Sequence, residues 1–174
     1  MTRSNITYSF ALGLALACSA TGASAAQDTE FAKKAAEGGM AEVQLGQIAA
    51  SNASDADIKN FGQRMVTDHS SANDQLKAAA QQDGVQLPQD VSKEHKAAAD
   101  RLSKLQGDAF DKEYARMMVK DHEEDVALFK KEATSGKDAN LKAFAQKTLP
   151  TLEDHLKMAQ QLNASSKKTT SSRQ

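Results

Sequence analysis

This chain of 174 residues has only one cysteine, two prolines and no tryptophan, and it has no excess of positive charge. A single cysteine excludes a disulfide framework and any zinc or iron–sulfur site built from several cysteines. The 22 lysine and arginine residues are matched by 23 aspartate and glutamate residues. Because no surplus of cations is available to displace the counterions of phosphates, the sequence does not indicate a nucleic-acid binder.

Motifs of common catalytic sites are missing as well. The sequence contains no Gly-x-Ser-x-Gly motif, and its cysteine lies in a segment that is predicted to be removed. A phosphate-binding glycine loop is also absent, because Gly38 and Gly39 are flanked by helical patterns on both sides. The sequence therefore assigns no catalytic residue, and a protein without enzymatic activity is the favoured interpretation.

Residues 1–25 have the pattern of a secretory signal peptide. Arg3 supplies a basic start, residues 10–17 form an apolar run too short to span a bilayer, and residues 23–25 (Ala-Ser-Ala) match a cleavage site. No later segment approaches the roughly 18 consecutive apolar residues that a membrane span needs. The mature chain is therefore predicted to have no transmembrane segment and to reside in the periplasm.

Cys18 allows an alternative in which the protein is anchored as a lipoprotein. The three residues before it, Ala-Leu-Ala, lack the usual leucine three positions upstream, and a better cleavage site follows. Removal of Cys18 with the signal peptide is the favoured interpretation.

The rest of the chain has the hydrophobic periodicity of long helices and lacks clusters of β-branched residues and Asn-Gly hairpin turns. Short joints predict antiparallel pairing of the first long helix with the second and of the third with the fourth. The predicted fold is an all-α, ferritin-like four-helix bundle with a long crossover that contains a short extra helix. The long helices are expected over residues 29–51, 55–82, 108–134 and 137–162, and the short one over residues 91–105.

This bundle is predicted to form one domain over residues 28–163, because a chain of this length can build a sufficient core without disulfides. Residues 164–174 are polar and of low complexity, so they are predicted to be a disordered tail.

Ionisable residues interrupt the apolar face of every long helix. They lie at similar depths along their helices, so an antiparallel bundle is expected to bring them into one layer. Burying such groups without partners costs several kcal/mol, so they should pair, reach water or bind an ion. The candidate metal ligands are Glu42, His69, Asp121, His122, Asp125 and His155.

Two interpretations of this layer remain open. Imidazoles and carboxylates that project inward from facing helices are how bundles build metal sites, and iron, manganese, zinc and copper are all candidates. Against a di-iron centre, no histidine has a glutamate three residues before it, so the paired Glu-x-x-His motif is absent. The alternative is a hydrogen-bonded polar network without metal.

Two further polar residues are expected to have no part in binding. Asp68 can pair with Arg64 one helical turn earlier. His95 lies among Lys93, Glu94 and Lys96 on the crossover helix, so it is expected to be exposed to solvent.

Four motifs, in order along the chain, resemble those of the bacterial "domain of unknown function 4142" family. They are residues 38–42 (Gly-Gly-Met-Ala-Glu), 64–69 (Arg-Met-Val-Thr-Asp-His), 118–122 (Met-Val-Lys-Asp-His) and 148–155 (Thr-Leu-Pro-Thr-Leu-Glu-Asp-His). The resemblance implies an exported, ferritin-like bundle without an assigned activity. The motif positions of the family include Glu42, His69, His122 and His155.

Two classes of function follow from these observations. The first is a metal-binding bundle that stores, sequesters or carries out redox chemistry with a transition metal. The second is a non-catalytic structural or interaction module of the cell envelope or its stress response. The sequence identifies no protein partner and is compatible with a homo-oligomer.

Overall fold

The computed structural model describes residues 20–171, and within this range it has five helices and no strand. The predicted signal peptide lies largely outside the described residues, as does Cys18. In the part that the structure describes, no helix is both long and apolar enough to cross a membrane. The helices are α1 (Ala20–Asn52), α2 (Ala56–Gln82), α3 (Lys93–Leu102), α4 (Gly107–Ser135) and α5 (Ala139–Ser171).

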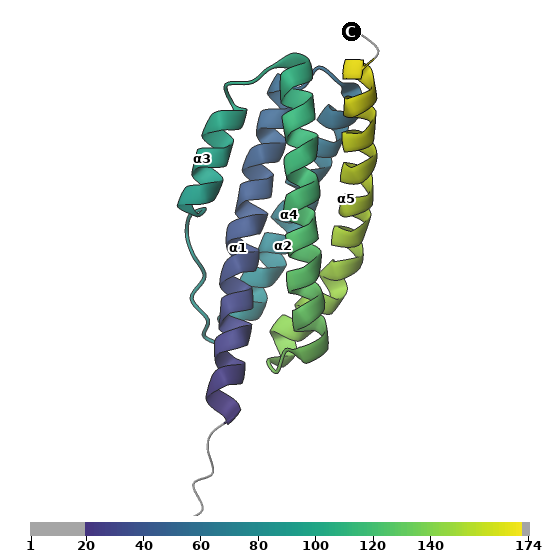
Figure 1. Cartoon of the computed structure of the whole chain (residues 1–174). Coiled ribbons are helices and arrows are strands. Elements are labelled where there is room, and N and C mark those ends of the chain that lie inside the picture. The colour runs from purple at the N-terminus through teal and green to yellow at the C-terminus, as the bar shows by residue number, and fades with distance from the viewer. Residues whose placement is uncertain (1–19, 172–174) are drawn as a thin grey trace, which may run out of the picture.

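The four long helices form two antiparallel hairpins, one of α1 with α2 and one of α4 with α5 (Figure 1). A long crossover connects the end of α2 to the start of α4 at the opposite end of the bundle, and it contains α3, which packs mainly against α1 (Figure 1). This connectivity is that of ferritin-like bundles. The predicted all-α, ferritin-like fold is therefore confirmed.

Asp111 of α4 fixes the short joint between α1 and α2. Its carboxylate accepts hydrogen bonds from the backbone N–H groups of Ser54 (3.1 Å) and Asp55 (2.9 Å). Asp55 in turn caps α2, since its side chain accepts from the first backbone N–H groups of that helix. The second hairpin thus determines the geometry of the first.

Asp28 of α1 plays the reciprocal part at the other end of the bundle. Its carboxylate accepts from the backbone N–H of Lys137 (3.2 Å) and of Asp138 (2.8 Å) in the joint between α4 and α5. Asp138 then accepts from the backbone N–H groups of Asn140 and Leu141, both at 2.9 Å, and so caps α5. Each hairpin therefore holds the turn of the other.

The two hairpins also repeat in sequence without a gap. Residue 28 aligns with residue 111 and residue 55 with residue 138, so both the clamping and the capping aspartates coincide. Phe61 falls on Phe144 and Ile58 on Leu141 in the same alignment. The two hairpins thus have clamping and capping aspartates at equivalent positions.

Two hydrophobic clusters fill the bundle and leave a polar layer between them. On each long helix, an ionisable residue of the candidate site lies in sequence between members of the first cluster and members of the second. The site is therefore held between two packed hydrophobic cores. The first cluster includes Leu45, Phe61, Met65, Phe110, Tyr114 and Met118, and the second includes Phe31, Leu76, Phe129, Phe144 and Leu152.

Helices α1 and α2 pack tightly at a pair of glycines, Gly46 and Gly62. A Cβ atom on Gly62 would lie 2.7 Å from the Cβ of Ala49 and 2.9 Å from the carbonyl oxygen of Gly46. Real Cβ atoms are essentially never so close to another heavy atom. Small residues at this crossing let the two helices pack tightly beside the polar layer.

The last helix departs from the sequence prediction. It continues beyond residue 162 to Ser171, and therefore includes most of the segment for which disorder is predicted. The hydroxyls of Ser165 and Ser166 donate to the carbonyl oxygens of Gln161 and Leu162 one turn earlier, so both hydroxyls have acceptors within the helix.

Candidate functional site

Glu42 of α1, His69 of α2, His122 of α4 and His155 of α5 meet in the centre of the bundle. All four are buried, with exposed fractions of 2%, 4%, 0% and 0%. The convergence that equal depth along the helices predicts is therefore found for these four residues. Each long helix contributes one of them.

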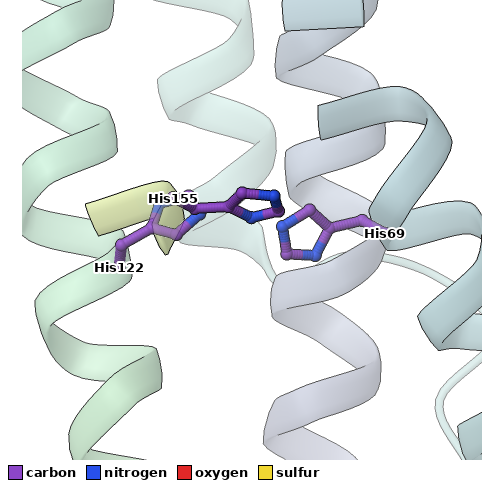
Figure 2. Close-up of side chains that lie close together, drawn as sticks. All are labelled: His69, His122 and His155. Atoms are coloured by element: carbon purple, nitrogen blue, oxygen red, sulfur yellow. The ribbon is translucent and has the colours of Figure 1, made fainter. Parts of the chain in front are cut away.

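The three imidazole rings lie close together and face one another (Figure 2). One ring nitrogen from each of His69, His122 and His155 can be chosen so that all three atoms lie within 4.8 Å of one another. The ring centroids are 5.4–5.7 Å apart. Known mononuclear zinc sites also use three imidazoles as ligands.

The orientation of His122 leaves one nitrogen with an available lone pair. Its Nδ1 lies 2.9 Å from the carbonyl oxygen of Met118, and a carbonyl oxygen can only accept a hydrogen bond. The proton of the neutral ring is therefore on Nδ1, and Nε2 carries the lone pair. This Nε2 is buried and has no hydrogen-bond partner among the described residues.

His155 is held in the opposite tautomer by a residue that the sequence analysis did not select. Its Nε2 donates to Oδ2 of Asp68 at 2.8 Å, while its Nδ1 is buried and lacks a hydrogen-bond partner in the described structure. Asp68 also pairs with Arg64 at 3.1 Å, as the spacing predicts. A carboxylate that orients the second nitrogen of a histidine is typical of metal sites.

Glu42 lies between two of the histidines. Its Oε2 is 2.8 Å from Nε2 of His69, and its Oε1 is 3.2 Å from Nδ1 of His122. The carboxylate of Glu42 and these two rings are thus ion-pair partners of one another inside the buried layer. Nε2 of His122 and Nδ1 of His155 are the ring nitrogens of the layer for which the described structure gives no partner.

The charges of this layer are strongly coupled. Burial by itself would raise the pKa of Glu42, but the attraction of His122 and His69 outweighs it and lowers the pKa to about 2. Burial opposes the protonation of His69, yet the facing Glu42 carboxylate raises its pKa above the usual value. For His155, burial dominates over Asp68 and lowers the pKa to about 4. His155 is therefore neutral at neutral pH, as a metal ligand must be.

Asp121 and Asp125, which the sequence also proposes as ligands, do not join the three histidines. They line an adjacent pocket of about 400 Å³, in which Glu42 forms part of the wall. Burial, followed by repulsion from Glu42, raises the pKa of Asp121 to about 6 and that of Asp125 well above its usual value.

His95 is not the exposed residue that its hydrophilic neighbours predict. It is half-buried and lines the same pocket as Asp121 and Asp125, and its Nδ1 is buried without a hydrogen-bond partner in the described range. The prediction was wrong because it considered only neighbours along the chain. Packing of α3 against α1 brings His95 to this pocket.

The histidine cluster breaks the symmetry of the two hairpins. In the alignment of the repeats, Glu42 corresponds to Asp125, so both halves keep an acidic residue at this position. None of the three histidines has a histidine as its counterpart, which restricts the cluster to one place in the bundle. Gly39, Leu152 and Ala72 stand at the positions that correspond to His122, His69 and His155.

The fold and the buried layer define a ferritin-like helical bundle with an internal cluster of histidines. The chain belongs to the family "Domain of unknown function (DUF4142)", which matches residues 14–162. No curated protein matches the chain in sequence.

Solved structures of DUF305 proteins share the fold. A DUF305 fragment from Deinococcus radiodurans is 14% identical, with a TM-score of 0.69, and the match covers 79% of this chain and 95% of that one. A DUF305 protein from Streptomyces coelicolor, assigned as secreted, is 16% identical with a TM-score of 0.67, covering 80% and 92%. CopM in its Cu(II)-bound form is 17% identical with a TM-score of 0.66, covering 79% and 96%.

Proposed function

We propose that this protein is an exported metal-binding bundle that holds one transition-metal ion between His69, His122 and His155, with Glu42 beside it. The observation that carries the proposal is the close grouping of three buried imidazoles, in which Nε2 of His122 and Nδ1 of His155 lack a partner among the described residues. For His122 and His155, the other nitrogen already has a fixed acceptor, so the lone pair points to the unpartnered side.

The alternative of a purely structural network leaves these atoms unexplained. A buried polar atom without a partner costs about 1–3 kcal/mol, and two such ring nitrogens, one of His122 and one of His155, share this layer. A bound cation would satisfy both of them together. Three nitrogens bound at about 2.0–2.1 Å to one ion lie about 3.3–3.6 Å apart, so rings whose nitrogens lie within 4.8 Å of one another would move inward to bind it.

The donor set favours copper or zinc over manganese among the candidate metals. Imidazole suits zinc, copper, iron and nickel, whereas manganese prefers oxygen ligands. Two carboxylates contact the histidines, Glu42 at His69 and His122 and Asp68 at His155, which is fewer than a carboxylate-bridged di-iron centre uses. The shared fold with CopM in its Cu(II)-bound form makes Cu(II) the first ion to test.

Export is part of the same proposal. The pattern of residues 1–25 and the secreted DUF305 protein with the same fold support it. The N-terminal sequence of protein recovered from the periplasm should begin at residue 26 or 27. A chain that keeps its first residues and stays in the cytoplasm would contradict export but would leave the metal site untouched.

Elemental analysis of the protein purified without a histidine tag tests metal binding directly. We expect close to one equivalent of metal in the wild type and a loss of most of it in His69→Ala and His122→Ala. His95→Ala serves as the matched control outside the three-histidine cluster, and it should retain this ion. Circular dichroism should show that the variants remain helical.

The alternative, a polar network without metal, predicts a different result. The wild type would then carry no metal and take up neither Cu(II) nor Zn(II) on titration. Both histidine variants would lower stability by the same amount with and without added metal.

A further inference from the structure

Glu132, in the last turn of α4, is a buried carboxyl group that the metal site does not use. It is 1% exposed, and neither side-chain oxygen has a hydrogen-bond partner within residues 26–167. The joint that follows α4 covers it, since a Cβ atom on Gly136 would lie 2.7 Å from its Cδ. A buried carboxylate without a partner is costly, so this position calls for a donor or a cation.

The start of α1 lies against this carboxyl group, at the same end of the bundle as the joint between α4 and α5 (Figure 1). Nε2 of Gln27 donates to Oγ of Ser135 at 3.4 Å, and Asp28 holds the backbone of the joint. Burial, and next the repulsion of Asp28, raise the pKa of Glu132, with a smaller contribution from Asp138, while the amide of Gln27 lowers it. The charged groups that affect Glu132 are therefore acidic.

The other hairpin shows that the clamp itself does not need a carboxyl group here. Asp111 makes the equivalent clamp, and the residue that corresponds to Glu132 in the alignment of the repeats is Ala49. The two ends differ in one further respect. Ala26, one residue before Gln27, is the first residue after the predicted cleavage site, whereas its counterpart lies inside α4, where no new terminus arises.

The sequence of α1 suits a helix that begins after this cleavage site. In the whole chain α1 begins at Ala20 and has no acidic residue in its first turn. A chain that begins at Ala26 places Asp28 and Glu30 in the first turn, where carboxylates favour the positive end of the helix dipole. Its new α-amino group has a usual pKa of about 7.7–8.0 and is charged at neutral pH.

We propose that removal of residues 1–25 creates an α-ammonium group on Ala26 that pairs with the carboxylate of Glu132 and so completes the clamp of Asp28. The inference rests on the export part of the proposed function and is independent of the metal site. The first N–H groups of a helix have no acceptor within it, so the amine of Ala26 is free to turn toward Glu132. A chain that keeps residues 1–25 has no charge at this position and leaves Glu132 without a cation.

Thermal unfolding of the chain that begins at Ala26, with a free or an acetylated amine, tests the pair, because acetylation removes the terminal charge. At about pH 7.5 and with chelator present, acetylation should lower the Tm by roughly 3–8 °C. In Glu132→Gln acetylation should have little effect. The control Glu123→Gln, which changes an exposed glutamate of α4, should respond to acetylation as the wild type does.

The effect of Glu132→Gln should also change sign with the state of the amine. The substitution should lower the Tm of the free chain and raise that of the acetylated chain, because only the free chain offers the carboxylate a cation. Equal Tm values for free and acetylated wild type would overturn the inference.

The pKa of the α-amino group, measured by NMR titration, gives an independent readout that does not depend on stability. A facing carboxylate should raise it from the usual 7.7–8.0 to about 9 or higher in the wild type. In Glu132→Gln it should return to the usual range. A pKa of about 7.7–8.0 in both chains would contradict the pair.

N-terminal sequencing of the periplasmic protein separates this inference from the proposed function. If the chain begins at Ala26 but its free and acetylated forms melt alike, this inference is wrong and export stands. If the chain keeps residues 1–25, export is wrong, and the pair does not form in the cell. Neither result bears on the three histidines.

Discussion

Nε2 of His155 lies 2.8 Å from Oδ2 of Asp68, so a residue of α2 orients a buried imidazole of α5. The contact crosses from one hairpin to the other and leaves Nδ1 of His155 directed away from Asp68. Arg64 holds the same carboxylate at 3.1 Å, which completes a chain from the surface to the candidate site. Asp68 is therefore a positioning residue for His155.

Asp68→Ala should weaken metal binding without abolishing it. Loss of a carboxylate that orients a ligand histidine typically costs about 10–100-fold in metal affinity. Competition with a chelator of known affinity would measure the change. Asp74→Ala, which removes an exposed carboxylate from the same helix, is the control, and equal affinities for the two variants would contradict the role of Asp68.

Removal of metal should lower the thermal stability of the wild type. An ion that binds only the folded state stabilises it by about 2.7 kcal/mol at a hundredfold excess over Kd. For a domain of this size the Tm should fall by roughly 5–10 °C with a chelator. Differential scanning calorimetry checks this, and His69→Ala/His122→Ala should show no such dependence. A chelator-insensitive Tm in metal-loaded wild type would argue against the site.

The metal-free protein should lose stability as the pH falls from about 6.5 to about 4. His155 has its pKa lowered to about 4 by burial, so the unfolded chain binds a proton in this range that the folded chain excludes. The free energy of unfolding should fall by at most about 3 kcal/mol over this pH range because of His155. His155→Leu should flatten this part of the pH profile in urea titrations with chelator present. An equally steep loss in the variant would assign the pH dependence to other groups.

Glu132→Gln should stabilise the protein above pH 7 when its N-terminal amine is blocked. Glu132 is 1% exposed and neither carboxylate oxygen has a hydrogen-bond partner within residues 26–167. Burial, and next the nearby Asp28, raise its pKa to about 7. Because Glu132 binds a proton more tightly in the folded state, its own contribution to stability is most favourable below pH 4.5 and declines as the pH rises to about 7.

Glu132→Gln should raise the free energy of unfolding of this blocked chain by about 1–3 kcal/mol at pH 8, and this increase should disappear below pH 4.5. Urea unfolding at both pH values measures it. Glu123→Gln changes an exposed glutamate of the same helix and should have little effect at either pH. A destabilised Glu132→Gln at pH 8 would show that the charged carboxylate is favourable where it stands.

The clamping aspartates show what sequence comparison alone leaves undetected. A sequence comparison that aligns Phe61 with Tyr114 and His69 with His122 pairs α2 with α4. Duplication of a helical hairpin would instead pair α1 with α4 and α2 with α5. The structure reveals the alignment of residue 28 with 111, because Asp28 and Asp111 make equivalent contacts at opposite ends of the bundle. These contacts join residues far apart in the chain, so no local pattern discloses them.

The sequence by itself determined the helices, their pairing and the depth of Glu42, His69, His122 and His155, because hydrophobic periodicity and helical rise depend only on position along one helix. It did not determine which polar residues meet. Asp121, Asp125 and His95 share a pocket, and Asp68 reaches His155, only because of the rotation and packing of neighbouring helices. The tautomer of His155, and hence its available lone pair, was decided by Asp68 of another helix, whereas that of His122 follows from the carbonyl oxygen of Met118 on its own helix.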